Sequence, residues 1–488
     1  MSTDLAALAQ GGRTSVAGFV IRLIARLPFL FIASQWYGAN ALGRLAYAIA
    51  IVEFAAQLST LGLKRGLALH LTGAGKANGA WDAVLVVLGA TMIPTALLML
   101  VPEIMFPNSA IKPLDYLMPL VIPAVALSDV MLAALAFRFD VKSTVRARAI
   151  IEPWTISIAA IALWWSTPSD GLLVSYALSM MAALVASAIP FVRSYGWPQD
   201  WKPRAIELYA LARHNAPLAA ADAIEWGSRR LDTVILGLFV SPAMVGIYWV
   251  AQQIVSVPQK LKTSFDPVLG PVITRALDEG DKAAVARQIS QVGFWILAAQ
   301  LGIGLTLALA GRELMALIGP KQDFVGGNGS LALLLTAEVL ASLAVVSEAA
   351  LIYVARHKNM LVSLAMIAMQ AVLTVALIEL AKARGLPEGW QAAGAAAALA
   401  LSLGMGSLAK SALAQSVLGA PVSVWRGALV PAVAAAVIVG LAAHRLPGWA
   451  QLAVGLPATL GIFCWVIWTR GFSAEDRALF RKQAQPPP

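Results

Sequence analysis

Apolar stretches of about twenty residues, separated by short polar connections, recur along the whole chain. An α-helix of this length crosses a hydrocarbon layer of roughly 30 Å. The pattern predicts about fourteen membrane-spanning segments, at 16–36, 44–63, 83–101, 116–137, 147–165, 172–193, 216–240, 243–265, 289–310, 329–355, 360–381, 391–412, 426–444 and 449–469. We therefore expect an all-α, polytopic membrane protein.

The composition agrees with this pattern and limits the chemistry. Hydrophobic residues make up 59% of the 488 residues and charged residues 13%, and the mean hydropathy is +0.75, which lies outside the range of soluble domains. Cys464 is the only cysteine, so a disulfide framework or a thiol-metal site is excluded. The four histidines all lie near segment ends. We expect neither a metal site nor a cofactor.

The distribution of Lys and Arg predicts the orientation, because short cytoplasmic loops carry the excess. If the N-terminus is cytoplasmic, 25 of the 36 Lys and Arg residues lie on inside flanks, 7 on outside flanks and 4 within segments. Residues 1–15 lack the features of a secretory signal, so we expect the first segment to stay as an anchor. The sequence predicts a multi-pass protein of the bacterial cytoplasmic (inner) membrane with both termini inside. The net charge of +10 follows from this bias and from contact with anionic lipid, without nucleic acid.

The connections are too short for a catalytic domain. The longest outside connections are about 102–115 and 311–328. With no acid/base or histidine constellation besides, we expect a protein that is not an enzyme. The inside connection 194–215 is longer, and its residues from Lys202 to His214 are either a linker or an amphipathic surface helix.

Arginines inside the apolar segments are the main candidates for substrate binding. They are Arg22, Arg26, Arg229 and Arg230. An ionisable group at membrane depth costs at least about 2.5–3.5 kcal/mol, so it marks a function or is paired. Arg26 and Arg229 lie about 20 Å along their helices, near mid-membrane, and a guanidinium binds phosphate oxygens in a forked geometry. The alternative is an ion pair with an intramembrane acid, for which Glu53 and Glu225 are available.

A shift of the chain by 203 residues reveals an internal repeat. It aligns Arg26 with Arg229, Ile32 with Ile235, Gly43 with Gly246, Ala48 with Ala251, Ile51 with Ile254, Val52 with Val255 and Leu58 with Leu261. We expect the two glycines in the turns after the first and seventh segments. Six segments separate the copies, so both enter the membrane in the same sense. The repeat predicts two parallel six-helix lobes around a central cavity, 1–198 and 199–415, followed by two C-terminal helices and a cytoplasmic tail, 416–488. It favours Arg26 and Arg229 as the central pair, with Arg22 as an accessory and Arg230 as a structural or gating residue.

Intramembrane acids are candidates for a coupling ion or for pairing with the arginines. They are Glu53, Asp129, Asp222, Glu225, Glu338 and Glu348. Glu152, near a segment end, is interpreted as either a partner of the arginines or an interfacial cap. Prolines inside segments remove backbone hydrogen bonds and predict hinges or static kinks, at Pro28, Pro123 and Pro258.

Two regions of the chain resemble a known family. Leu231 to Ala251, followed by Val257-Pro258 and by Phe265 to Pro271, is similar to the seventh and eighth segments of polysaccharide transporter flippases. Ala41 to Tyr47, continued by Leu58 to Leu63, resembles the second segment of the same family. These flippases belong to the multidrug/oligosaccharidyl-lipid/polysaccharide exporter superfamily.

The resemblance implies a V-shaped pair of lobes that carries a polyprenyl-diphosphate-linked oligosaccharide or polysaccharide repeat unit across the membrane by alternating access. Candidate partners are this lipid-linked glycan, membrane lipids, a coupling proton or sodium ion, and glycan polymerisation machinery. Two alternatives belong to the same superfamily: a lipid II flippase of peptidoglycan synthesis, and a cation-coupled multidrug antiporter. The deep arginines count against the antiporter, and the short loops count against a membrane enzyme of glycan assembly.

Overall fold

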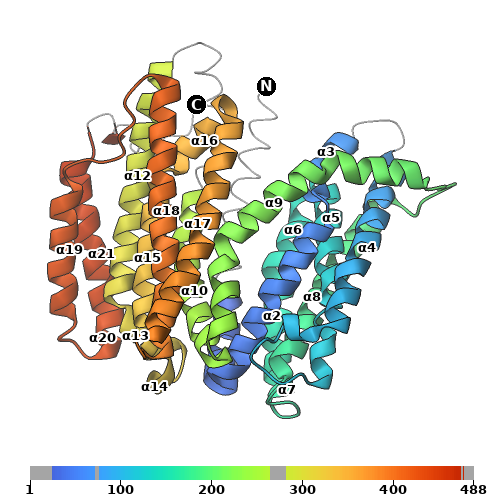
Figure 1. Ribbon diagram of the computed structural model, residues 1–488, viewed down its shortest axis with the longest axis horizontal. Coiled ribbons are helices and arrows are strands. Elements are labelled where there is room, and N and C mark those ends of the chain that lie inside the picture. Colours follow the sequence, from blue (N-terminus) through green and yellow to red (C-terminus); the bar gives the residue numbers. More distant parts are fainter. Residues whose placement is uncertain (1–24, 72–75, 264–281, 474–475, 478–488) are drawn as a thin grey trace, which may run out of the picture. The chain divides into compact units, whose positions relative to one another are not determined.

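The computed structural model describes residues 25–71, 76–263, 282–473 and 476–477. These ranges are almost entirely helical and contain no strand, which confirms the all-α class (Figure 1). The chain divides into two compact units, Met1–Trp249 with Ile318–Pro320 and Val250–Leu317 with Lys321–Pro488. The lobe boundaries inferred from the repeat stay a prediction.

The first unit is a bundle of apolar helices joined by short turns. A helix over 25–32 is followed by η1 (Ala33–Tyr37), α2 (Gly38–Ser59), α3 (Leu63–His70), α4 (Lys76–Leu100), η2 (Pro102–Ile104), η3 (Pro113–Leu117), α5 (Val121–Phe137), α6 (Val141–Val145), η4 (Arg146–Ile151), α7 (Glu152–Trp164), α8 (Gly171–Tyr195), α9 (Ala205–Phe239) and the start of α10 (Pro242–Thr263). Helix α8 packs against α5 and α7, and α5 also contacts α2, α3 and α4.

The turns of the repeat differ from the prediction. Gly43 lies inside α2 and Gly246 inside α10, so their placement in turns was wrong. The chain turns instead at Gly38, whose φ of +81° is open to glycine at little steric cost, and at Val240–Ser241 before α10. The two glycines have a packing role.

Helix α9 is longer than the predicted seventh segment. The surface stretch and the membrane segment form one helix of 35 residues, with Pro217 inside it. Leu211 and Asn215 are buried on its first half, and α9 packs against α2 and α3. This packing outweighs the loss of one backbone donor at Pro217, so the helix continues through the proline. For Lys202 to His214 the sequence allowed either a linker or an amphipathic surface helix. The structure has a helix from Ala205 onward, so the linker interpretation is wrong.

The second unit contains the rest of α10 and the helices that follow it. They are α12 (Lys282–Leu309), α13 (Gly311–Ile318), α14 (Lys321–Phe324), η5 (Val325–Gly327), α15 (Asn328–Ser342), α16 (Val345–Val354), α17 (Arg356–Ala383), α18 (Glu388–Leu418), α19 (Leu429–Ala443), α20 (Gly448–Ala450), η6 (Gln451–Gly455), α21 (Leu456–Val466) and η7 (Ile467–Gly471). Helix α18 packs against α15 and α17. The predicted segment 329–355 is broken into α15 and α16 at Leu343–Ala344.

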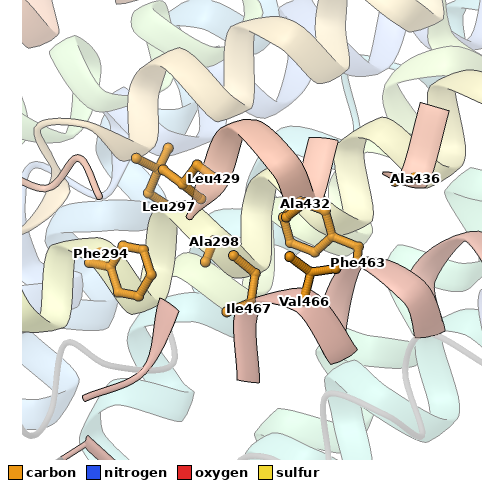
Figure 2. Packing of buried hydrophobic residues seen from close by; sticks show 9 residues of the cluster. All are labelled: Phe294, Leu297, Ala298, Leu429, Ala432, Ala436, Phe463, Val466 and Ile467. Carbon is orange, nitrogen blue, oxygen red and sulfur yellow. The ribbon is translucent and has the colours of Figure 1, made fainter. Parts of the chain in front are cut away.

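The last helices of the chain pack on α12 through an apolar core (Figure 2). Its buried residues are Phe294, Leu297, Ala298, Leu429, Ala432, Ala436, Phe463, Val466 and Ile467. A side chain at Gly302 of α12 would collide with the ring of Phe463, since its Cβ would lie 2.7 Å from Cδ1. Helices α19 and α21 are therefore built into the second unit.

Large apolar side chains also cover the outside of the helices. Ile93, Leu100 and Val372 are among those that are strongly exposed, as expected for side chains that face lipid. Ten helices in the ranges that the structure describes are long and apolar enough to cross a membrane, and two more, Val345–Val354 and Leu429–Ala443, are apolar but shorter. The protein is a multi-pass membrane protein, while the count of fourteen stays a prediction.

Candidate functional site

Arg148 is the centre of a buried ion-pair cluster in the first unit. Its Nη1 donates to Oε2 of Glu152 at 3.0 Å, and its Nη2 donates to Oδ1 of Asp129. Lys64 Nζ lies 3.5 Å from the second carboxylate oxygen of Asp129. A guanidinium taken out of water needs such partners. The cluster therefore ties together α3, α5 and the start of α7.

Arg26 reaches the same cluster from the helix over 25–32. Its Nη2 lies 3.4 Å from Oε1 of Glu152, and the Arg26 side chain is 48% exposed whereas that of Glu152 is 8% exposed. Glu152 thus forms ion pairs with two arginines. It lies farther from the more accessible one, Arg26, than from Arg148.

A second cluster lies on α9 and has the same arrangement. Arg65 Nε lies 2.8 Å from Oδ1 of Asp222, and Arg65 Nη2 lies 2.5 Å from Oε2 of Glu225. Arg229 Nη2 donates to Oε1 of Glu225 at 3.1 Å, one helical turn away. The side chains of Arg229 and Glu225 are 37% and 46% exposed. Glu225 is also shared by two arginines, and here both are accessible, because the Arg65 side chain is 50% exposed.

The short helix α3 joins the two clusters. Its Lys64 contacts Asp129 of the first cluster, and its Arg65 contacts Asp222 and Glu225 of the second.

Two glycines allow α3 to lie directly against α9. A Cβ on Gly62 would lie 2.6 Å from the carbonyl oxygen of Asn215, and one on Gly66 would lie 1.8 Å from its Oδ1. Gly62 also has a φ of +75°, a conformation that glycine adopts readily. The close approach brings the basic pair of α3 within reach of both sets of acids.

Two further acids of the first unit accept hydrogen bonds from tyrosines. Tyr176 of α8 donates to Oε1 of Glu53 in α2 at 3.2 Å, and Tyr248 of α10 donates to Oδ2 of Asp232 in α9 at 2.5 Å. Glu53 therefore does not hold Arg26, although the sequence offered it as a partner. Glu152, at the start of α7 directly after η4, pairs with Arg26 instead.

The remaining predicted acids lie in the second unit. Glu338 of α15 is buried, and its Oε1 accepts a hydrogen bond from Gln259 at 3.0 Å. Glu348 of α16 lies 2.9 Å from Nζ of the buried Lys410 of α18. Neither takes part in the two clusters of the first unit.

The other predicted site residues have varied surroundings. Arg22 lies outside the described residues, and Arg230 is half-buried on α9. Pro28 lies in the helix over 25–32, and Pro258 lies inside α10, where its carbonyl accepts a hydrogen bond from Gln300 at 2.5 Å.

Pro123 does not support the argument for a hinge. It lies in the first turn of α5, where the backbone N–H has no helical acceptor. No helical hydrogen bond is lost there, so the predicted weak point is not found. The roles of Pro28 and Pro258 stay predictions.

Several side chains of the clusters were not recognised in the sequence as site residues. Lys64, Arg65 and Arg148 were counted as cytoplasmic flanks, and Glu152 was interpreted as either a partner of the arginines or an interfacial cap. The i, i+4 spacing of Arg148 and Glu152 was the available signal. It predicts a pair on one helix face, but it does not show that the face points into the bundle.

The two clusters suit the binding of an anion. Their ion pairs involve five cations, Arg26, Lys64, Arg65, Arg148 and Arg229, and four acids, Asp129, Glu152, Asp222 and Glu225. Within the described residues, no group of three or more His, Cys, Asp or Glu side chains could hold a metal ion. Accessible guanidinium groups that share their carboxylates can exchange them for phosphate oxygens.

Comparison with known proteins gives a family match and one related sequence. A family described as "Polysaccharide biosynthesis protein" matches residues 38–318. The probable flippase AglR of Haloferax volcanii is 34% identical over 144 residues, which are 29% of this chain and 28% of that protein. The alignment therefore spans less than a third of either protein.

Solved transporter structures share the fold. The lipid II flippase MurJ in an inward closed conformation aligns over 93% of this chain and 98% of its own, with a TM-score of 0.69 and 12% identity. An inward-facing multidrug resistance MATE family transporter of the MOP superfamily aligns over 82% and 98%, with a TM-score of 0.61 and 13% identity. These relatives are flippases and transporters rather than enzymes.

Proposed function

We propose a flippase function for this chain, which belongs to the polysaccharide biosynthesis protein family. In this proposal the protein moves a polyprenyl-diphosphate-linked oligosaccharide or polysaccharide repeat unit across the bacterial inner membrane by alternating access. The family description, the partial likeness to a probable flippase and the transporter fold support it.

The arrangement of the accessible arginines carries the proposal. Arg26 and Arg229 are related by the repeat, and each pairs with a carboxylate that a second arginine also holds. Glu152 and Glu225 are each divided between two guanidinium groups, and Arg148 and Arg65 each have a further acid, Asp129 and Asp222. A diphosphate brings several charged oxygens in one group, so it can replace the carboxylates without leaving either guanidinium unpaired.

The second arginine of each cluster, the largely buried Arg148 or the half-exposed Arg65, keeps the acid paired when the substrate binds. When a diphosphate binds Arg26 in place of Glu152, Glu152 keeps its hydrogen bond with Arg148. When a diphosphate binds Arg229 in place of Glu225, Glu225 keeps its ion pair with Arg65. Binding therefore leaves no isolated charge in the low-dielectric interior, which would be the expensive outcome. The same exchange run backwards releases the substrate.

The proposal is tested by replacing the arginines in cells that lack the native protein. The quantity measured is the polyprenyl-diphosphate-linked glycan on the inner face of the membrane and the glycan exported. We expect Arg26→Ala and Arg229→Ala each to cause accumulation inside and loss of export. Arg204→Ala is the matched control, because Arg204 is an exposed arginine outside both clusters. Normal export with both cluster arginines removed would sink the anion-binding role.

The same strains separate the two alternatives. A lipid II flippase would, when lost, cause lipid II to accumulate and stop peptidoglycan synthesis. Loss of a cation-coupled multidrug antiporter would reduce the efflux of cationic dyes and leave the distribution of lipid-linked glycans between the two membrane faces unchanged. Either result, obtained with a folded protein, would replace the proposal.

A further inference from the structure

The loop between α4 and α5 reaches the C-terminal end of α9. Asn108 Nδ2 donates to the carbonyl oxygens of Gly237 at 2.8 Å and of Val240 at 2.9 Å. The last carbonyls of a helix have no partner within the helix. Asn108 supplies two of the missing donors, so this loop caps a helix more than a hundred residues further along the chain.

The same loop is fixed to α2 by a buried ion pair. Arg44 Nη2 contacts both carboxylate oxygens of Asp115, at 2.9 and 2.8 Å, and Arg44 Nη1 donates to the carbonyl oxygen of Ala110 at 3.1 Å. Asp115 is fully buried, and the guanidinium lies over the ring of Phe106 at 5.1 Å. The loop therefore has one strong attachment, to α2, and one through Asn108 to α9.

At this end of the first unit α2 also meets the start of α10 through the repeat-related glycines. A Cβ on Gly43 would lie 1.6 Å from the carbonyl oxygen of Pro242, and a Cβ on Gly246 would lie 2.2 Å from that of Ala39. Only glycines permit this distance between the backbones. Corresponding positions of the two repeats thus touch where the loop ties their helices together.

Little space is left around this contact. The cavity beside it has a volume of about 10 Å³, close to that of one water molecule. Its lining includes Gly43, Asn108, Pro242 and Val245, and the Val245 side chain is buried. Val245 is therefore closed to a reagent until the contact among α2, α10 and the α4–α5 loop opens.

We propose that the α4–α5 loop is a latch that holds α2 against α9 and α10, and that Asn108 is its release point. The bonds of Asn108 are neutral and join the loop to the second repeat. The Arg44–Asp115 pair is charged and buried, and it has two hydrogen bonds. Breaking it would leave an isolated charge. When the contact between the repeats opens, the loop stays with α2 and Asn108 leaves α9. The inference rests on the proposed transport function for its purpose, but the opening itself is measured independently.

The test uses the purified full-length chain in lipid nanodiscs, with Cys464→Ser to remove the native thiol and Val245→Cys as a reporter. The rate at which N-ethylmaleimide labels Cys at position 245 reports opening. We expect slow labelling in this background and at least tenfold faster labelling when Asn108→Ala is added. Ser109→Ala, which leaves both bonds of Asn108 in place, is the control and is expected to change nothing. Equal rates with and without Asn108 would overturn the latch.

A second pair of substitutions closes the latch covalently. Asn108→Cys and Val240→Cys, in the background without Cys464, place two thiols across the hydrogen bond to Val240, where oxidation or a short bifunctional reagent joins them. We expect export of the lipid-linked glycan in cells to fall at least tenfold after cross-linking and to recover with a reductant or a cleavable reagent. Full export with quantitative cross-linking would show that this contact need not open.

The two readouts separate the latch from the proposed function. If the uncross-linked protein exports no lipid-linked glycan, the proposed function fails. The labelling rates still decide whether Asn108 controls the opening.

Discussion

The two ion-pair clusters of the first unit have the same arrangement but differ in burial. In each, a carboxylate lies between an accessible arginine and a second arginine from another helix. Glu152 is almost completely buried, whereas Glu225 is about half exposed. Under the proposed function, the first cluster would combine binding with a structural role, and the second would act mainly in binding. This difference leads to four predictions.

Arg148→Ala should have the largest effect on stability. It leaves the buried carboxylates of Asp129 and Glu152 short of a partner, which costs about 3–5 kcal/mol. Arg229→Ala in the exposed cluster should cost less than about 1 kcal/mol. Thermal unfolding of the purified proteins in one detergent measures both. Similar melting temperatures for the two variants would contradict the difference in burial.

Neutralising the shared acids, Glu152 and Glu225, should again destabilise the buried cluster more than the exposed one, but by less than the loss of Arg148 does. Glu152→Gln removes a buried acceptor of two guanidinium groups, and we expect a loss of about 2 kcal/mol. Glu225→Gln, in the half-exposed pair, should change the stability by less than about 1 kcal/mol. The measurement is the unfolding midpoint at low and high salt, and only the small contribution of Glu225 should vanish at high salt.

Replacing the accessible arginines by lysine tests whether substrate binding needs the bidentate geometry of the guanidinium group or only its positive charge. Arg26→Lys and Arg229→Lys keep the charge but lose the bidentate geometry, worth about 1 kcal/mol or roughly fivefold in binding. We expect export of the lipid-linked glycan to fall by a similar factor in both, less than in the alanine variants. Lysine variants as active as the native protein would show that charge alone suffices.

An ion pair outside the membrane segments gives the smallest expected effect and a reference for the clusters. Burial raises the pKa of Asp476, but hydrogen bonds from Arg426, Gln291 and Ser473 outweigh it and hold this pKa well below its usual value. The pair therefore contributes stability above about pH 4, and this contribution is lost as the pH falls further.

The check is the unfolding temperature at decreasing pH. We expect it to be constant between about pH 7 and 5 and to fall below about pH 4. The decrease should be smaller in Arg426→Ala. A decrease of the same size in both proteins would show that other carboxyl groups cause it.

The sequence predicted the all-α class and most of the apolar helices, because the length of an apolar stretch is a local property. It offered the pair between Glu225 and Arg229 as the alternative to substrate binding, since both lie on one helix face. It did not predict the pair between Arg26 and Glu152, which are 126 residues apart. Their meeting depends on how helices pack, and one sequence without an alignment contains no signal for that.

Residues next to apolar segments were the hardest to interpret. Lys64 and Arg65 follow the second segment directly, and a count of positive charges treats them as a flank whether they point outward or into the bundle. The break at Leu343–Ala344 was missed for a related reason, because neither residue is a helix breaker. Both features are set by tertiary contacts that outweigh local preference.

The eight-residue helix α3 has a consequence for genetics. One short stretch, Gly62 to Gly66, supplies cations to both clusters and lies against α9. A single substitution at Gly62 would displace Lys64 and Arg65 together and so affect two sites that lie far apart in the sequence. Loss-of-function alleles should therefore concentrate in this stretch, and alleles at Gly62 should resist single-site suppression.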